Sequence, residues 1–336
     1  MNVGMNYQIN AKGNHGYMNK ATNITLEEAA KFLLDNDDYL ILSHANPDGD
    51  TFGCAYALCG ALQRKGKRVK IACADPLSER FLYLKETIEE QEFAEKIIVS
   101  VDVADKSLLG ELEEKYGDRV DLALDHHVSH RSFGKRIFVD DTAAAACEII
   151  YDLVLLLGDG AMDEKVARCL YTGIATDTGC FKFGNTTRVT HEKAGKLMEY
   201  GFDTAALNYT LFDMKTKARI KLERYVFENI EFFAEDKGAL IALSKDILDS
   251  VDIEDVNGIS ALPRQIQGVE VGVVLKEKKD GWKASLRSNN VNVQEICGLF
   301  GGGGHIRAAG CTIKGASLDD VKKQIMAAVT NAVKEL

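Results

Sequence analysis

The sequence predicts an α/β protein with an N-terminal doubly wound parallel-sheet domain, a helical connector and a smaller C-terminal α/β domain. Short apolar segments rich in branched residues alternate with helical patterns as far as residue 201. Residues 202–230 are charged and helical without a strand signal, and strand candidates return beyond residue 231. A length of 336 residues also favours two domains.

The N-terminal domain is expected over residues 23–201, after an extension of residues 1–22. This extension is rich in Asn, Gly and Lys, which predicts flexibility. Thr25 and Glu28 form a capping-box pattern that begins a helix through Leu34. The later elements expected in this domain are, in order, strand 39–43, helix 51–65, strands 69–72 and 97–101, helix 108–116, strands 120–124 and 137–139, and helices 143–157 and 163–174.

The second domain is expected over residues 231–336, beyond the connector of residues 202–230. Its predicted elements are strands 239–243, 269–275 and 282–287, a glycine cluster at 301–304, a short strand at 312–314 and a closing helix at 318–333. Fewer elements over a shorter span predict the smaller of the two domains.

Composition limits the classes of function. The net charge of −10 and the pI of about 5.3 argue against a broad grip on duplex nucleic acid, but they allow a short anionic substrate. The eight cysteines form no CxxC pair, which favours small buried residues in a reducing compartment. We find no secretory signal pattern and no apolar run that could span a bilayer, so a cytoplasmic protein without membrane attachment is expected.

The apolar run 120–124 ends abruptly in Asp125, His126 and His127. Its near-continuous hydrophobicity is typical of a buried strand in a parallel sheet. Ligands in open α/β sheets bind beyond the carboxyl ends of the strands. Three groups of this kind are costly to bury without a partner, which a cation would supply. An isolated Asp-His-His could equally form a surface turn.

The same pattern recurs at other predicted strand and helix ends. It involves His44, Asp48 and Asp50 after the first strand, Asp102 after a later strand, and Asp177 near the end of helix 163–174. Taken singly, the segment from Asp48 to Asp50 could be a plain turn, Asp102 a helix cap and Asp177 a loop residue. Recurrence at four ends favours one shared site.

Carboxylates and imidazoles without cysteine suit a Mn²⁺-like ion or a pair of such ions. So many carboxylates would repel one another unless cations neutralised them. Two ions about 3.5–4 Å apart can clamp a phosphoryl group and activate a water molecule. The residues therefore predict metal-assisted hydrolysis of a phosphoester, with two divalent ions as cofactors and Mn²⁺ as the first candidate.

Five motifs resemble a known family. HANPDGD, VSVDVAD, LDHH and GIATDTG resemble, in order, the four motifs of DHH-family phosphoesterases, and SLRS with GGGGHIRAAG resembles the accompanying DHHA1 domain. The similarity runs from about residue 25 onward. The compact two-domain form resembles the branch of nanoRNases and pAp phosphatases. Those enzymes degrade very short oligoribonucleotides and remove the 3′-phosphate of 3′-phosphoadenosine 5′-phosphate (pAp).

The resemblance implies a role for each matching residue of the first domain. The implied metal ligands are His44 and Asp48 for one ion, Asp50, His126 and Asp177 for the other, and Asp102 between the two. Asp125 would orient the neighbouring histidine, and His127 would contact the scissile phosphate or assist proton transfer. His130 and His191 are expected to be surface residues, and His15 is expected to be inert.

In the second domain the resemblance implies a substrate site. Its expected members are Arg287, Ser288, Gly302, Gly303, Gly304 and His305, with Arg264 and Arg307 as weaker candidates. Arg287 would pair with a terminal phosphate, and the loop from Gly301 to Gly304 would offer backbone N–H groups to the same anion. Without the other motifs, this glycine cluster would be interpreted as a flexible turn.

The expected activity is that of a metal-dependent phosphodiesterase and phosphomonoesterase acting on dinucleotides, short oligoribonucleotides and pAp. Standalone phosphodiesterases for cyclic di-AMP and linear pApA share these motifs and remain an alternative. A catalytically inactive nucleotide-binding module is a second alternative, although such a binder would not need the complete set of metal-binding side chains. Dimers are common in this family, but no residue pattern identifies an interface.

Overall fold

The structure is a computed structural model that describes residues 21–256 and 258–334. Residues 1–20 lie outside this part, so the predictions for His15 and for most of the extension are not addressed. The chain divides into two compact units, which meet between Asp213 and Met214. This boundary falls inside the predicted connector of residues 202–230, whose first part belongs to one unit and whose second part belongs to the other.

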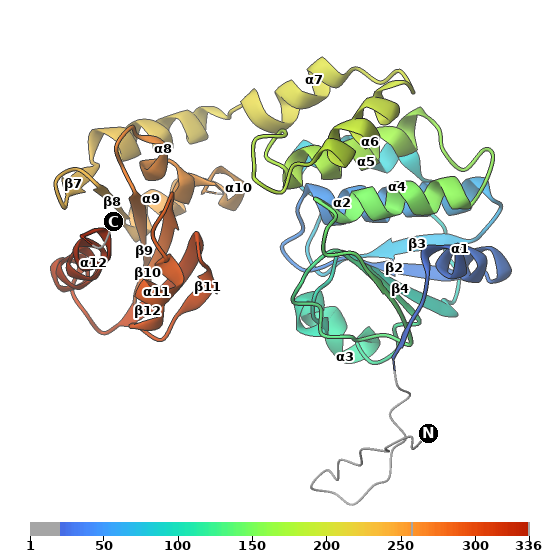
Figure 1. The fold of residues 1–336 in the computed structure, drawn as a ribbon, viewed down its shortest axis with the longest axis horizontal. Helices are drawn as coiled ribbons and strands as arrows, with labels where there is room; N and C mark the ends of the chain where they lie inside the picture. Colours follow the sequence, from blue (N-terminus) through green and yellow to red (C-terminus); the bar gives the residue numbers. More distant parts are fainter. Residues whose placement is uncertain (1–20, 257, 335–336) are drawn as a thin grey trace, which may run out of the picture. The chain divides into compact units, whose positions relative to one another are not determined.

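The N-terminal unit is built on a six-stranded sheet in which every strand pair is parallel (Figure 1). The strand order is β1-β6-β5-β4-β2-β3. The strands are β1 (Thr22–Asn23), β2 (Tyr39–Leu42), β3 (Val69–Ala72), β4 (Ile97–Val101), β5 (Leu122–Asp125) and β6 (Arg136–Val139). Parallel order places every carboxyl end at one edge, as predicted. The two-residue strand β1 was not predicted.

Helices cover both faces of this sheet, which confirms the doubly wound arrangement. They are α1 (Leu26–Asp35), α2 (Gly49–Arg64), α3 (Glu113–Tyr116), α4 (Ala146–Leu156), α5 (Glu164–Asp177), α6 (Arg188–Met198) and α7 (Thr204–Asn208). Segments of 3-10 helix are η1 (Glu79–Thr87) and η2 (Lys106–Leu112), and η3 (Tyr209–Asp213) is a segment of π-helix. The larger core lies under α1, α2, α4 and α5, and a smaller core lies against α3 and η2.

A capping box and a glycine explain why one predicted helix forms and another is broken. The capping box at Thr25 and Glu28 begins α1 as expected. The predicted helix 108–116 is instead broken at Gly110, whose φ of 59° is left-handed. A side chain at Gly110 would also meet Ala45 and Ala74. Gly110 therefore allows this segment to pack closely against Ala45 and Ala74, which a continuous helix would prevent.

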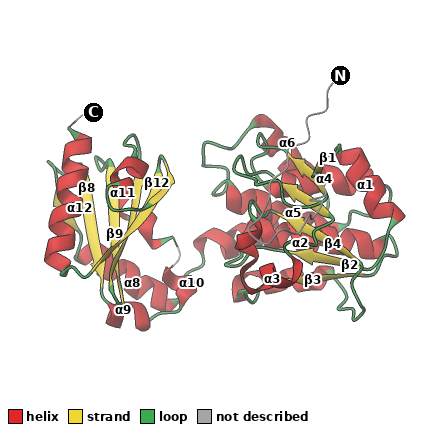
Figure 2. Cartoon of the chain, turned by 90° about the horizontal axis from the view of Figure 1, so that it is seen from below, coloured by secondary structure: helices red, strands yellow, loops and turns green. Residues whose placement is uncertain are grey.

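The C-terminal unit contains a second six-stranded sheet of order β11-β12-β10-β9-β8-β7 (Figure 2). The strands are β7 (Glu231–Phe233), β8 (Gly238–Leu243), β9 (Val271–Lys278), β10 (Gly281–Ser288), β11 (Gly303–His305) and β12 (Ala308–Lys314). Among the described strands of this second sheet, β8 and β9 form the only parallel pair. The glycine cluster is thus not a plain loop, because part of it forms the edge strand β11.

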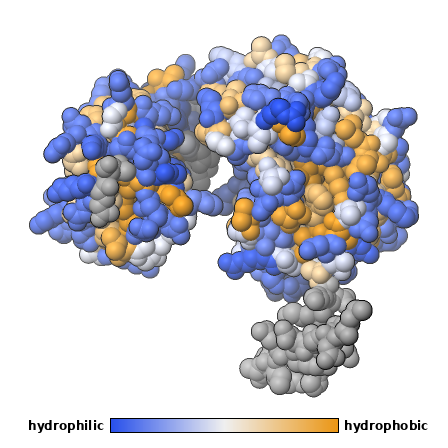
Figure 3. All heavy atoms as spheres, in the orientation of Figure 1, coloured by the Kyte–Doolittle hydropathy of each residue, from blue (hydrophilic) through white to orange (hydrophobic). Residues whose placement is uncertain are grey.

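Helices cover the two faces of the second sheet unequally. The elements are α8 (Lys217–Glu228), α9 (Lys245–Asp249), α10 (Ile253–Val256), η4 (Ile259–Ala261), η5 (Pro263–Gln265), α11 (Val293–Gly298) and α12 (Leu318–Val333). On one face, α11 and α12 bury the apolar side of β9 and β10. On the other face, α8 and η4 pack over β8 and part of β9. Hydrophilic residues are prominent on the visible surface of the C-terminal unit, whereas hydrophobic residues gather in the middle of the visible face of the N-terminal unit (Figure 3).

Candidate metal centre of the N-terminal unit

The site lies at the carboxyl edge of the first sheet, where α2 begins and α5 ends. Three glycines allow α2 and α5 to approach closely. A side chain at Gly49 would overlap Thr176, one at Gly53 would meet the carbonyl oxygen of Cys169, and one at Gly173 would overlap Asp50 Oδ1. This packing brings the first turn of α2 to the end of α5, which places Asp50 near Asp177.

His44, Asp48 and Asp102 form the first cluster. His44 Nε2 lies 3.8 Å from Asp48 Oδ1 and 3.7 Å from Asp102 Oδ2. Asp48 also begins α2, because its Oδ1 accepts hydrogen bonds from the N–H groups of Asp50 and Thr51. The same carboxylate therefore serves as a helix cap and faces the cluster.

His126, Asp50 and Asp177 form the second cluster, and Asp102 borders it as well. His126 Nε2 lies 3.9 Å from Asp50 Oδ2, 3.8 Å from Asp177 Oδ2 and 3.6 Å from Asp102 Oδ1. These separations exceed hydrogen-bond length. They are shorter than about 4.2 Å, which is twice a typical Mg²⁺ or Zn²⁺ ligand distance. Groups at this spacing can share an ion.

Asp102 is the residue common to both clusters, and it uses a different oxygen in each. It is buried at the end of β4 with a left-handed φ of 56°, and its N–H donates to the carbonyl oxygen of Leu124. Its Oδ1 is buried without a hydrogen-bond partner among the described residues. Burial, together with the charges of Asp50 and Asp48, raises the pKa of Asp102 well above its ordinary value.

The pKa values of the other two acids of the second cluster, Asp50 and Asp177, are raised as well. Burial raises the pKa of Asp50, and burial with the charges of Asp50 and Asp48 raises the pKa of Asp177 to about 8. Cations bound among these carboxylates would reverse both effects, because they favour the ionised form. The donor set is therefore chemically suited to divalent ions, and the orphaned Asp102 oxygen lacks the partner that an ion would provide.

Both histidines of the clusters are oriented by their second ring nitrogen. Nδ1 of His44 lies 2.9 Å from the carbonyl oxygen of Ala45, and Nδ1 of His126 lies 3.1 Å from that of Ala143. A carbonyl oxygen requires a proton on the facing nitrogen, which leaves Nε2 with its lone pair toward the carboxylates. Each ring is thus held in the tautomer that a metal ligand needs.

Asp50 is fixed by the amino-terminal end of α4. Its Oδ2 accepts from the N–H of Ala146 at 2.6 Å, and its Oδ1 accepts from the N–H of Cys147 at 2.9 Å. Ala145, the cap residue of α4, has no side-chain acceptor, so Asp50 caps this helix from a distant segment. Oδ2 is also the oxygen that faces His126.

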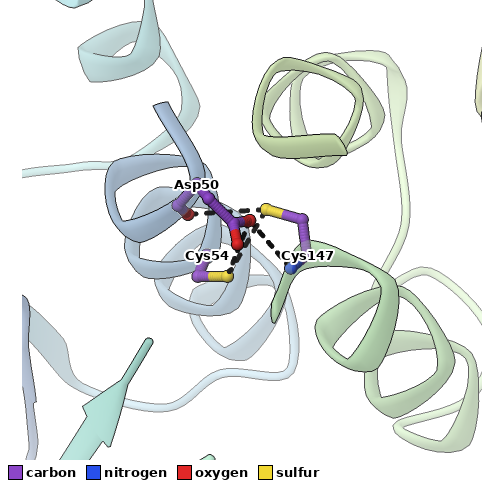
Figure 4. A group of neighbouring side chains, drawn as sticks. All are labelled: Asp50, Cys54 and Cys147. Atoms are coloured by element: carbon purple, nitrogen blue, oxygen red, sulfur yellow. Dashed lines mark hydrogen bonds between the residues drawn. The ribbon is translucent and has the colours of Figure 1, made fainter. Parts of the chain in front are cut away.

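Two cysteines lie beside Asp50, although no sequence pattern predicts cysteine near the site. Figure 4 shows Cys54 and Cys147 on either side of the carboxylate, with their sulfurs 3.4 Å apart. The Sγ of Cys54 lies 3.7 Å from Asp50 Oδ1. Burial raises the pKa of both thiols well above the ordinary value, so the protonated forms are favoured. All eight cysteines are free.

Asp125 orients two histidines rather than one. His127 Nδ1 lies 2.8 Å from its Oδ1, and His130 Nδ1 lies 2.8 Å from its Oδ2. Burial alone would raise the pKa of Asp125, but these two hydrogen bonds and the charges of both rings hold it well below its ordinary value. The hydrogen bond to Asp125 raises the pKa of His127.

His130 is not the surface residue that we expected. Its side chain is only 4% exposed, and its ring stacks on Phe133. The only sequence signal was its position three residues after His127, which carries little weight in a loop. His191 does lie at the surface, where it stacks on Phe181.

The predicted residues of the second domain are placed less uniformly. Arg287 is half-buried on β10, and its Nη1 donates to the carbonyl oxygen of Leu286. His305 is exposed on the edge strand β11. Ser288 is buried, and its hydroxyl donates to the carbonyl oxygen of Val291 at 2.5 Å. This hydrogen bond closes the turn after β10, and the role of Ser288 toward a substrate stays a prediction.

The three glycines of the cluster serve different purposes. A side chain at Gly302 would overlap the carbonyl oxygen of Gly310, and Gly304 has a φ of 141° that side chains rarely adopt. Gly303 has open space around it. Two of the three are therefore explained by close packing against β12.

Sequence comparisons find one family match in each of the two units. Residues 38–174 match the DHH family, N-terminal domain, and residues 240–335 match the DHHA1 domain. A protein of Thermus thermophilus named bifunctional oligoribonuclease and PAP phosphatase NrnA is 33% identical over 296 residues, which cover 86% of this chain and 88% of the relative.

The chain belongs to the DHH/DHHA1 family of phosphoesterases. It is accordingly a hydrolase that acts on phosphoester bonds. Both family domains occur in the predicted order, and the motif HANPDGD lies near the start of the N-terminal match. The predictions of family, fold class and enzyme class are thereby confirmed.

Solved structures extend the likeness of the fold. An exopolyphosphatase-related protein from Bacteroides fragilis superimposes with a TM-score of 0.82 at 23% identity, covering 92% of this chain and 97% of that one. RecJ from Thermus thermophilus in complex with Mn²⁺ has a TM-score of 0.52 at 14% identity, covering 90% and 54% of the two chains. Among the described residues, no helix is long and apolar enough to cross a membrane.

Proposed function

We propose that the chain hydrolyses short oligoribonucleotides and the 3′-phosphate of pAp with two divalent ions held in the N-terminal unit. The similarity to NrnA of Thermus thermophilus, whose name contains both activities, supports this substrate class. The observation that carries the proposal is the position of Asp102, which offers one oxygen to each of two clusters.

In this proposal His44, Asp48 and Asp102 hold one ion, and Asp50, His126, Asp177 and Asp102 hold the other. When bound, two such ions neutralise phosphate charge and supply a hydroxide at neutral pH. Manganese is the first choice, because carboxylate and imidazole ligands suit it and because a RecJ with this fold is known in complex with Mn²⁺.

His127 is proposed to act on the substrate phosphate. Asp125 takes its Nδ1, so Nε2 remains free among the described residues, and the side chain is 43% exposed. An imidazolium in this position can donate a hydrogen bond to a phosphate oxygen or a proton to the leaving oxygen. Asp125 and His130 keep the ring in that orientation.

The C-terminal unit is proposed to bind the other end of the substrate. Arg287 supplies a planar fork that matches phosphate oxygens, and no carboxylate pairs with it among the described residues. The exposed edge of β11 adds backbone N–H groups, since an edge strand leaves every second one unpaired. His305 lies on the same strand.

The test is hydrolysis of four substrates after removal of metal with EDTA and addition of Mn²⁺. We expect Mn²⁺-dependent release of mononucleotides from a labelled diribonucleotide and of phosphate from pAp. Parallel assays with linear pApA and cyclic di-AMP measure selectivity. Turnover that persists in EDTA, or cyclic di-AMP as the only substrate, would contradict the proposal.

A further inference from the structure

On the face of the second sheet that α8 and η4 cover only in part, two lysines near Arg287 are not used by the proposed terminal-phosphate site. Lys276 on β9 lies directly opposite Lys283 on β10 in an antiparallel pair. Arg287 follows four residues later on β10 and therefore points to the same face. Trp282, Ala284 and Leu286 alternate with them and face the core under α12.

This pair of lysines is unfavourable for the fold itself. Like charges directly opposite each other on neighbouring strands repel. Burial and the charges of Lys283, Lys278 and Arg287 lower the pKa of Lys276. No ion pair involves Lys276, Lys283 or Arg287 among the described residues, although the chain carries ten more negative than positive charges.

The residues that lie beside these cations on β12 have small side chains. On the same face, the residues of β12 opposite β10 are Thr312, Gly310 and Ala308, which pair with Lys283, Ser285 and Arg287. Small side chains leave room above the sheet for a flat or extended group. Cations that are separated along a sheet surface with small side chains suit an extended polyanion better than a single compact ion.

We infer that Lys276 and Lys283 form a second phosphate subsite, which binds a further phosphodiester of an oligonucleotide whose terminal phosphate lies at Arg287. This inference rests on the proposed function. Lys283 and Arg287 are four residues apart on one strand, which separates their Cα atoms by about 13 Å. A single phosphate group cannot span this distance, so the subsite contributes only to substrates longer than a dinucleotide.

The test compares wild type with the double variant Lys276→Gln, Lys283→Gln on a diribonucleotide and a pentaribonucleotide. We expect KM for the pentamer to rise about tenfold, as for the removal of charge-assisted hydrogen bonds, while KM for the dimer stays within about twofold. The matched control is Lys323→Gln, Lys334→Gln. These two exposed lysines lie on α12 and directly after it, on the side of the sheet opposite Lys276 and Lys283. This control should leave both values unchanged.

Binding without turnover separates this inference from the proposed function. Fluorescence anisotropy of a labelled pentamer in EDTA should show a salt dependence whose slope, in log Kd against log salt, falls by about 0.7 for each phosphate that the variant no longer neutralises. An equal defect for dimer and pentamer, or an unchanged pentamer slope, would overturn the inference. Wild-type binding of the pentamer with no hydrolysis of any nucleotide would instead overturn the proposed function.

The melting temperature of Lys283→Gln distinguishes a loss of pentamer binding from a loss of folding. Lys283 is exposed, so Lys283→Gln alone should leave the melting temperature unchanged or raise it, because a repulsive pair is removed. The single variant should show a smaller rise in pentamer KM than the double variant. A pentamer defect accompanied by a lower melting temperature in Lys283→Gln would contradict a binding role.

Discussion

The two units carry uncompensated charges of opposite sign, and the difference lies in how they are held. In the N-terminal unit, Asp50 and Asp102 are almost completely buried, and their pKa values are raised by burial. In the C-terminal unit, Lys276 and Arg287 are only half-buried on a sheet face that helices cover in part. Buried anions require cations that stay bound, whereas half-exposed cations can bind and release a phosphate chain.

The construction of the two sites differs in the same way. The acidic cluster is assembled from segments between His44 and Asp177, which meet only after the sheet and the α2–α5 packing have formed. The basic face is supplied largely by the neighbouring strands β9 and β10. Substitutions in the first site should therefore be strongly coupled, whereas those of Lys283 and Arg287, whose Cα atoms lie about 13 Å apart along β10, should be nearly additive.

The largest expected effect is that of Asp102→Asn. This change removes the charge from the residue shared by both clusters, so kcat for a diribonucleotide should fall by more than about a hundredfold, which is the upper range for residues that only support metal ligands. Asp141→Asn removes the same charge from an exposed loop and should leave kcat unchanged. Steady-state kinetics in excess Mn²⁺ provide the measurement.

A smaller but still large effect is expected for Gly173→Ala. The added methyl would overlap Cys147 Sγ and Asp50 Oδ1, so unfolding in urea should show destabilisation by about 1–3 kcal/mol, and Mn²⁺ affinity should fall. Gly195→Ala lies in α6 with open space around it and should stabilise by up to about 1 kcal/mol. Equal stability changes in both variants would contradict the close-packing explanation.

An intermediate effect is expected for His130→Phe. The substitution keeps a ring against Phe133 but removes the hydrogen bond to Asp125, so kcat should fall by about 10- to 100-fold. KM should change little if His130 acts only by orienting His127 through Asp125. His191→Phe changes an exposed ring that also stacks, so kcat should stay unchanged. A fall in kcat of similar size in this control would contradict the proposed role of His130.

The smallest effect concerns a charge that is paired outside both sites. A hydrogen bond from the backbone of Glu95 and one from Lys70 lower the pKa of Glu95 to about 2. A depressed folded-state pKa contributes stability above pH 4.5, which is lost as the pH falls toward 2. Urea unfolding at pH 6 and pH 3 should show that Glu95→Gln loses less stability on acidification than wild type, by less than about 1 kcal/mol.

Sequence patterns predicted the parallel sheet and the residues at its carboxyl edge because both follow from short-range signals. Apolar runs that end in Asp or His identify the strand ends, and parallel order then brings these ends together. His130, Cys54 and Cys147 were missed because only tertiary packing places them against Asp125 and Asp50. No periodicity distinguishes them from ordinary loop or core residues.

The second domain was predicted less well, and the reason is again physical. The edge strand β11 consists of residues with weak strand preference, and it forms because Gly302 and Gly304 allow close approach to β12. Ser288 belongs to a motif shared with the family, yet its hydroxyl is used inside the turn. Resemblance identified the segment but not the direction of each side chain.

Equilibrium dialysis of Mn²⁺ against the metal-free chain, with bound metal counted per chain, tests the account most directly. We predict two ions bound to wild type and fewer than two bound to Asp102→Asn, because one carboxylate serves both clusters. Wild-type protein that binds no ion, or an Asp102→Asn variant that still binds two with unchanged affinity, would contradict it.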